Sequence, residues 1–241
     1  MARHGSAQLT GPLILALENS TMCGSIALVA EGLCLAENSL TTSTTHSQRL
    51  LASIHHLMAE GGVSWERLDA IAISTGPGSF TGLRIGLATA KGLAMATGKP
   101  LIGVSSLDTL ACQLPWTAQT ICPVIDARKH EVYTAFYRCD HSGYPKRESA
   151  YVAIAPESLA LMIRDDVIFV GDGSTLYQEV FTEVLGKRAH FACPELFFVR
   201  AAALGHCAMN RWRQGQFLDP ANATPDYIRP SEAEINFPSG V

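Results

Sequence analysis

Apolar runs alternate with amphipathic stretches along this chain, and their order predicts an α/β protein. Helical spacing of apolar residues predicts helices between strand-length apolar runs, with one further helix starting at Pro156. The predicted helices cover residues 45–60, 83–97, 105–113, 176–185 and 199–214. The predicted strands cover residues 13–17, 25–29, 33–37, 70–74, 101–104, 121–125, 132–138, 150–154 and 167–170.

The order of these elements occurs twice: a strand ending in an acid, a hairpin, a helix, a strand, a glycine turn and a helix. Glu18 and Asp126 are the two strand-end acids. Such internal repetition predicts two similar lobes with a cleft between them. We expect an N-terminal lobe over residues 12–108, a C-terminal lobe over 109–219, and an irregular proline-rich tail over 220–241.

The first glycine turn, residues 75–82, joins a strand to a long helix. A helix start of this kind offers free backbone N–H groups and the positive end of the helix dipole to an anion. The loop lacks the Lys-Ser or Lys-Thr of a P-loop, and it lacks the Gly-x-Ser-x-Gly of a nucleophile elbow. Two readings stay open: a ligand loop, or a tight turn that needs glycine for close backbone approach.

Composition narrows the functional classes. Hydrophobic residues make up 47% of the chain, charged residues make up 17%, and the net charge is −4, so autonomous nucleic-acid binding is not expected. No apolar run is long enough to span a membrane. The seven cysteines form no Cys-x-x-Cys pair, which predicts reduced thiols in the cytoplasm.

The histidines give no sign of a metal site, because His-x-x-x-His and His-Glu-x-x-His are both absent. This argues against a metallopeptidase. Serine catalysis has no support either, because neither Ser20 nor Ser79 belongs to a recognisable Ser-His-Asp arrangement.

The helix over residues 83–97 carries small residues at four-residue spacing on two faces. One face has Gly86, Ala90 and Ala94, and the other has Ala88, Gly92 and Ala96. A helix that is apolar nearly all round must be covered on more than one side, either by its own domain or by a partner's helices. The interface hypothesis, in which some residues still face their own sheet, names Leu50, Ile54, Leu57, Gly86, Leu87, Ala90, Ala94 and Met95.

The duplicated unit, its strand-end acids and its glycine turns resemble the actin-like ATPase (ribonuclease H-like) fold. Four stretches are similar to the TsaB (YeaZ) group of the glycoprotease-like family, and the resemblance extends over roughly residues 13–234. The stretches are residues 15–21, 74–86, 125–133 and 225–230. The resemblance implies a non-catalytic partner of TsaD, which transfers a threonylcarbamoyl group to adenosine 37 of tRNA.

The same resemblance implies that ATP and metal belong to partner subunits and that this chain has no cofactor of its own. TsaD holds its metal through His-x-x-x-His, whereas the matching residues 106–110 contain no histidine. The implied partners are a TsaD-type subunit in a heterodimer, a TsaE-type ATPase, and a second copy of the chain in isolation. Contact with tRNA is expected only through the complex.

Two other activities stay open: an autonomous ATPase or kinase of the same fold, and a glycoprotease-type metallopeptidase. Glu18-Asn19-Ser20 stands where the family usually has Asp-Thr-Ser, which weighs against an intact phosphate site. Glu18 and Asp126 either form a carboxylate pair across the cleft or make local turn bonds. A vestigial nucleotide or phosphate site would comprise Glu18, Ser20, Gly76, Gly78, Ser79, Asp126, Gly171 and Gly173.

Overall fold

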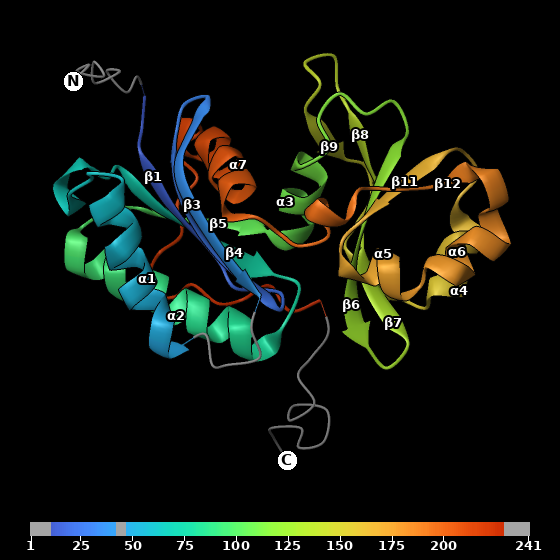
Figure 1. Cartoon of the computed structure of the whole chain (residues 1–241), viewed down its shortest axis with the longest axis horizontal. Coiled ribbons are helices and arrows are strands. Elements are labelled where there is room, and N and C mark those ends of the chain that lie inside the picture. The colour runs from blue at the N-terminus through green and yellow to red at the C-terminus, as the bar shows by residue number, and fades with distance from the viewer. Residues whose placement is uncertain (1–10, 42–46, 229–241) are drawn as a thin grey trace.

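The computed structural model describes residues 11–41 and 47–228, which form two lobes that lie side by side (Figure 1). The N-terminal lobe is built on a sheet in the order β3-β2-β1-β4-β5. Its strands are β1 (Ile14–Glu18), β2 (Cys23–Ala30), β3 (Leu33–Thr41), β4 (Ala70–Gly76) and β5 (Leu101–Ser105).

The C-terminal lobe repeats this order as β10-β7-β6-β11-β12. Its strands are β6 (Thr120–Arg128), β7 (Glu131–Thr134), β10 (Val152–Ile154), β11 (Val167–Val170) and β12 (Ala189–Phe191), with β8 (Tyr137–Cys139) and β9 (Pro145–Arg147) as a side hairpin. In both lobes the first strand pairs antiparallel with the next strand and parallel with the strand after the helix. The predicted duplication is therefore confirmed strand by strand.

Helices cover both faces of each sheet. The helices are α1 (Ser47–Glu60), α2 (Phe80–Thr97), α3 (Ser106–Cys112), α4 (Pro156–Met162), α5 (Asp172–Leu176), α6 (Gln178–Leu185) and α7 (Ala201–Arg213). Short 3-10 turns lie at Trp65–Arg67, Gly186–Arg188 and Pro194–Leu196. One face of the first sheet forms a core with α1 and α2, and the opposite face forms a core with α7. In the second sheet, α4 and α6 cover one face and α3 packs on the other.

The helix that follows each lobe's last strand crosses the boundary between the lobes. After β5, α3 packs against β6 of the C-terminal lobe, and after β12, α7 packs against β1 and β2 of the N-terminal lobe. The boundary of the C-terminal lobe predicted at residues 109–219 is therefore corrected, because α7 completes the N-terminal core. Its apolar stripe at Leu204, Cys207 and Ala208 buries the sheet face that would otherwise meet water.

Two further elements differ from the sequence prediction. The strand predicted over residues 132–138 is interrupted at Ala135 and Phe136, where the chain leaves β7 and turns into β8. The helix predicted over residues 176–185 starts earlier, at Asp172 directly after Gly171, and is divided at Tyr177. The first turn predicted at residues 45–46 and the tail over residues 229–241 lie outside the described part of the chain.

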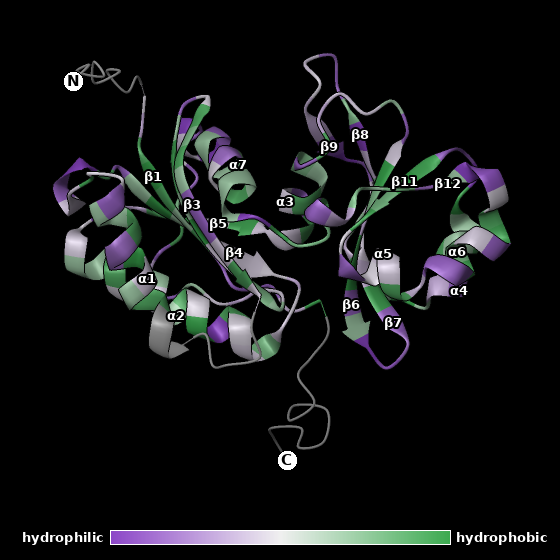
Figure 2. Ribbon diagram, viewed as in Figure 1, coloured by the Kyte–Doolittle hydropathy of each residue, from purple (hydrophilic) through white to green (hydrophobic). Residues whose placement is uncertain are grey.

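The hydrophobic residues gather along the strand centres, whereas the β6–β7 turn is hydrophilic (Figure 2). In the described part of the chain, no helix combines the length and the apolar character that crossing a membrane requires.

Candidate functional site

The acid at the end of β1 lies inside the N-terminal lobe, beside the glycine loop that follows β4. Glu18 is fully buried. Ser20 donates both its backbone N–H and its hydroxyl to Glu18 Oε1, and both hydrogen bonds are 2.5 Å long. Ser74, which lies near the carboxyl group, has its hydroxyl hydrogen-bonded to that of Ser106 at 2.7 Å. Among the described residues, no group hydrogen bonds to Glu18 Oε2.

Burial raises the pKa of the Glu18 carboxyl from 4.5 to about 7, against the opposing effect of the hydrogen bonds from Ser20. A charged carboxylate with one oxygen unpaired is costly in an apolar interior, so the proton is held more tightly than in water. Glu18 therefore titrates near neutral pH rather than standing as a permanent anion.

The glycine loop uses its own polar groups to close against the turn after β1. The Ser79 N–H donates to the Ser20 carbonyl at 2.7 Å, and the Asn19 side-chain amide donates to the Gly82 carbonyl at 2.9 Å. The Ser79 hydroxyl caps α2 by accepting the Gly82 N–H at 3.3 Å. These bonds occupy the N–H groups of Ser79 and Gly82, two of the donors that this helix start would otherwise offer to an anion.

Two glycines make this close approach possible. A Cβ atom at Gly78 would lie 2.2 Å from the Ser20 carbonyl oxygen, and one at Gly82 would lie 2.1 Å from the Asn19 carbonyl oxygen. Real side chains do not tolerate such distances, so these positions require glycine for backbone packing. The space beside Gly78 and Gly82 is filled by the chain's own backbone, so a phosphate of a bound Mg-nucleotide could not lie on that side of the loop.

The matching loops of the C-terminal lobe are also closed by local contacts. Both carboxylate oxygens of Asp126 are taken by Arg128, through its N–H at 2.9 Å and its guanidinium at 3.1 Å. The Asp126 N–H donates to Asp172 at 3.2 Å, and burial raises the pKa of Asp172. A Cβ at Gly171 would lie 2.3 Å from the Val124 carbonyl oxygen, and one at Gly173 would lie 2.8 Å from the Val124 side chain. Glu18 and Asp126 thus each make local turn bonds, which is one of the two readings that the sequence leaves open.

Residues 226–228, near the C-terminus, lie against the first glycine loop and the start of α2. The Asp226 N–H donates to the Thr75 carbonyl at 2.8 Å, and the ring of Tyr227 stacks on Phe80 with centroids 4.9 Å apart. Ile228 then packs against the core that α3 forms with the C-terminal sheet. This red segment runs under the N-terminal lobe and reaches the gap between the lobes (Figure 1). The proline content predicts its irregular backbone but gives no sign of this docking.

Replacing Tyr227 with alanine should lower the free energy of unfolding by about 1 kcal/mol, because the stacked pair with Phe80 is lost. Tyr227→Phe keeps the ring and removes only the hydroxyl, which accepts a hydrogen bond from Arg84 Nε at 3.1 Å. It should therefore lose less than half as much. Urea unfolding of both variants measures this, and equal loss in both would show that stacking contributes nothing.

Residues 39–237 match the protein family described as TsaD, tRNA N6-adenosine threonylcarbamoyltransferase. The TsaB protein of Bacillus subtilis strain 168, described as a tRNA threonylcarbamoyladenosine biosynthesis protein, is 30% identical over 226 residues. That alignment covers 93% of this chain and 97% of the Bacillus protein. The chain belongs to the TsaB family.

Solved structures agree with membership of the TsaB family. A Pseudomonas aeruginosa protein described as similar to peptidase YEAZ has 31% identity and a TM-score of 0.79, over 90% of this chain and 100% of that one. Component A of (R)-2-hydroxyglutaryl-CoA dehydratase from Acidaminococcus fermentans shares the fold alone, at 11% identity and a TM-score of 0.53, over 83% of this chain and 99% of that one. The fold is the actin-like ATPase fold that the sequence predicts.

Most of the residues named for a partner interface lie in the N-terminal core of this TsaB-family chain. Of the eight, Met95 alone is exposed, at 70%, and the other seven are buried, because they face their own sheet. The buried seven are Leu50, Ile54, Leu57, Gly86, Leu87, Ala90 and Ala94. The face of α2 that is open to solvent carries the second small-residue stripe, Ala88, Gly92 and Ala96. The four-residue spacing had marked both stripes, and only packing distinguishes them.

No group of three or more His, Cys, Asp or Glu side chains within residues 11–41 and 47–228 is arranged to hold a metal ion. The expectation of no resident metal stays a prediction.

Proposed function

We propose that this chain is a non-catalytic scaffold and activator subunit for threonylcarbamoyl transfer to adenosine 37 of tRNA. The observation that carries this proposal is the closed glycine loop, where the backbone of the turn after β1 lies against Gly78 and Gly82. A phosphate at this helix start would have to compete with the hydrogen bonds that the N–H groups of Ser79 and Gly82 already make. The family, whose Bacillus member is a tRNA threonylcarbamoyladenosine biosynthesis protein, supplies the reaction.

In this proposal a TsaD-type transferase, with its own metal, carries out the transfer. A TsaE-type subunit binds and turns over ATP, and this chain has no cofactor of its own. The complex works in the cytoplasm, and this chain contacts tRNA only as part of the complex. The alternative of an autonomous ATPase or kinase requires tight Mg-ATP binding by the isolated chain. The alternative of a peptidase requires a bound metal and peptide cleavage.

The surface that we propose for the TsaD-type partner is the solvent-facing side of α1 and α2. On α2, Ala88 and Gly92 are exposed beside Met95, and a Cβ added at Gly92 would meet nothing within 4 Å. On α1, Leu51 is 58% exposed. Small residues let a partner helix approach closely, and Leu51 and Met95 provide apolar area around them. Without the partner, the same surface would pair two copies of this chain.

Replacing Ala88 with arginine should weaken binding to the TsaD-type subunit by at least about tenfold, because a long charged side chain would be buried at a close helix contact. The fold should be unaffected, since Ala88 is exposed. Thr182→Arg on α6, an exposed position of the other lobe, is the matched control. Light-scattering chromatography of each protein, alone and mixed with the TsaD-type subunit, measures the change.

The wild type and Thr182→Arg should each form a homodimer alone and a one-to-one complex in the mixture. Ala88→Arg should lose both assemblies. A wild-type monomer that ignores the TsaD-type subunit would overturn the scaffold proposal, and intact assembly of Ala88→Arg would overturn the surface.

A further inference from the structure

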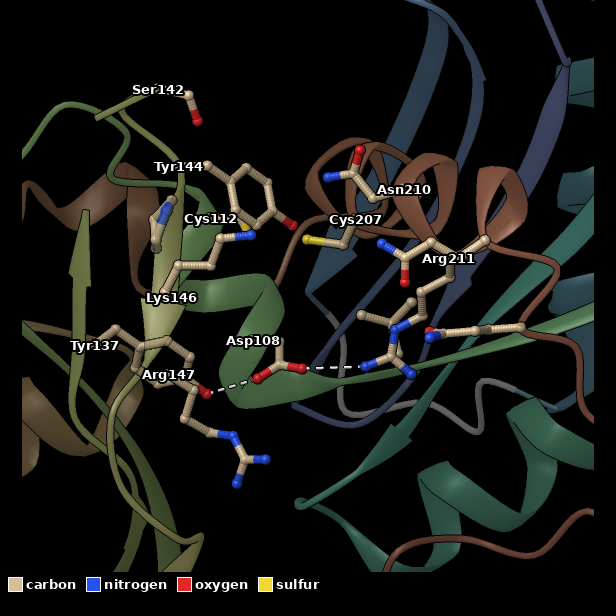
Figure 3. Close-up of a pocket in the computed structure, with 14 residues that line it drawn as sticks. Asp108, Cys112, Tyr137, Ser142, Tyr144, Lys146, Arg147, Cys207, Asn210 and Arg211 are labelled. Carbon is tan, nitrogen blue, oxygen red and sulfur yellow. Dashed lines mark hydrogen bonds and ion pairs between the residues drawn. The ribbon is translucent and has the colours of Figure 1, made fainter. Parts of the chain in front are cut away.

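A second site lies between the lobes, away from the glycine loops. It is a cavity of about 570 Å³ bounded by α3, α7 and the β8–β9 hairpin (Figure 3). This volume falls within the range of small-molecule sites in proteins. In Figure 1 these elements lie on the side of the molecule opposite the start of α2 and the β6–β7 turn. The cavity thus has no part in the site described above.

The charges around this cavity are unequal: its walls carry Lys146, Arg147 and Arg211 but a single carboxylate, Asp108. Both carboxylate oxygens of Asp108 already accept hydrogen bonds. Its Oδ1 accepts the hydroxyls of Tyr137 and Tyr151 at 2.8 and 2.7 Å, and its Oδ2 accepts Arg211 at 3.2 Å. Arg211 also donates to the Gly103 carbonyl at 2.6 Å, so this pair is part of the framework. Asp108 therefore pairs with Arg211 and does not neutralise Lys146 or Arg147 of the hairpin.

The two cations of the hairpin remain available to a ligand. Among the described residues, Arg147 makes no ion pair with a carboxylate, and its guanidinium lies over the Tyr151 ring at 4.0 Å and donates to the Ser149 carbonyl at 3.3 Å. Lys146 reaches Asp140 only at 3.8 Å, and Oδ1 of Asp140 already accepts three hydrogen bonds from its own turn. The Lys146 amine points toward Tyr144 and the facing helices (Figure 3). Neutral side chains that can donate hydrogen bonds complete the wall, namely Tyr144, Asn210, Gln214 and Gln216.

We propose that this cavity binds a small phosphate-bearing molecule, held by Lys146 and Arg147. Two cations without a close carboxylate partner and several neutral donors suit an anion with many oxygen acceptors, and Arg and Lys both bind phosphate through charge-assisted hydrogen bonds. The hairpin belongs to the C-terminal lobe and α7 packs on the N-terminal lobe, so a ligand here contacts both lobes. Bound ligand would thereby stabilise their relative arrangement. The inference is independent of the proposed scaffold role.

A cysteine in the cavity wall can report whether a ligand occupies the cavity. Cys112 on α3 lines the cavity, and its pKa lies below the usual value because it shares a hydrogen bond with the thiol of Cys207 on α7. Alkylation by iodoacetamide requires access to the thiol, which a ligand in the cavity would block. Cys193 is exposed and does not line this cavity, so it serves as an internal reference. A ligand in the cavity should therefore slow the alkylation of Cys112 and leave that of Cys193 unchanged.

The test uses pyrophosphate as the probe on the full chain at low salt, with calorimetric titration and mass spectrometry of alkylated cysteines. We expect saturable binding that protects Cys112. Lys146→Gln and Arg147→Gln should each weaken binding at least about tenfold, the effect of losing one charge-assisted hydrogen bond. Lys187→Gln, at an exposed position in the turn after α6 that does not line this cavity, is the control and should bind as wild type.

Absence of binding would overturn the proposal. So would binding that leaves Cys112 unprotected, or binding that Lys146→Gln and Arg147→Gln do not weaken. Both variants replace exposed residues, so both should remain folded at the temperature of the titration, and thermal unfolding without probe checks that misfolding is not the cause.

Discussion

Replacing Gly82 with alanine should lower the free energy of unfolding by at least about 3 kcal/mol, a large share of the stability of a typical domain. The added Cβ would lie 2.1 Å from the carbonyl oxygen of Asn19, which is backbone and cannot rotate away. Relieving the clash requires the turn after β1 to move, and this breaks the hydrogen bond from the Asn19 amide to the Gly82 carbonyl. Urea unfolding followed by circular dichroism measures the loss.

The same helix provides the control for this substitution. Gly92 lies ten residues further along α2, and a Cβ there would meet nothing within 4 Å. Gly92→Ala should raise the stability of the isolated chain by up to about 1 kcal/mol, because alanine has the higher helix propensity. Equal effects of the two substitutions would contradict the close packing of loop and turn.

Replacing Glu18 with glutamine should remove a pH dependence of stability worth roughly 3 kcal/mol, since each pKa unit corresponds to about 1.4 kcal/mol. The folded protein holds this proton with a pKa of about 7, whereas a glutamate exposed to water in the unfolded chain has its ordinary pKa of 4.5. Between these values the folded state binds more protons than the unfolded state, so stability falls as the pH rises. The loss of stability caused by ionising the buried Glu18 carboxyl is absent below pH 4.5 and complete above pH 7.

Unfolding free energies at pH 5, 6, 7 and 8 for wild type and Glu18→Gln test this expectation. The unfolding free energy of Glu18→Gln minus that of the wild type should increase as the pH rises. Taking the difference removes the contribution of histidines and other groups common to both proteins. Glu179→Gln, at an exposed position of α6, should follow the wild-type curve. Parallel curves for wild type and Glu18→Gln would contradict a shifted carboxyl.

The duplicated order of strands could be predicted from the sequence because each lobe repeats the same local pattern of apolar run, acid and glycine turn. The path of α7 could not. Its apolar stripe shows that one face is covered, but nothing in that stripe states which lobe covers it. The chain returns from β12 to the first sheet because α7 covers a sheet face that would otherwise be exposed to water, and this tertiary contact is not visible in the local sequence.

The glycine loop shows the same limit at the level of the site. Its sequence is compatible with both a phosphate loop and a tight turn, because both uses require glycine beside a helix start. The decision depends on what lies opposite Gly78 and Gly82, and there the structure places the carbonyls of Ser20 and Asn19. On α2, likewise, the spacing marks two small-residue stripes, and only the position of the sheet shows that Ala88 faces solvent.

The measurement that tests the scaffold account most directly is formation of threonylcarbamoyl-adenosine in purified tRNA. The reaction contains a TsaD-type subunit, a TsaE-type ATPase, ATP and a threonylcarbamoyl donor, with this chain present, omitted, or supplied as the only protein. The account predicts product when all three proteins are present. It predicts little or none when this chain is omitted and none from this chain alone. Product from this chain alone, or an undiminished yield without it, would contradict the account.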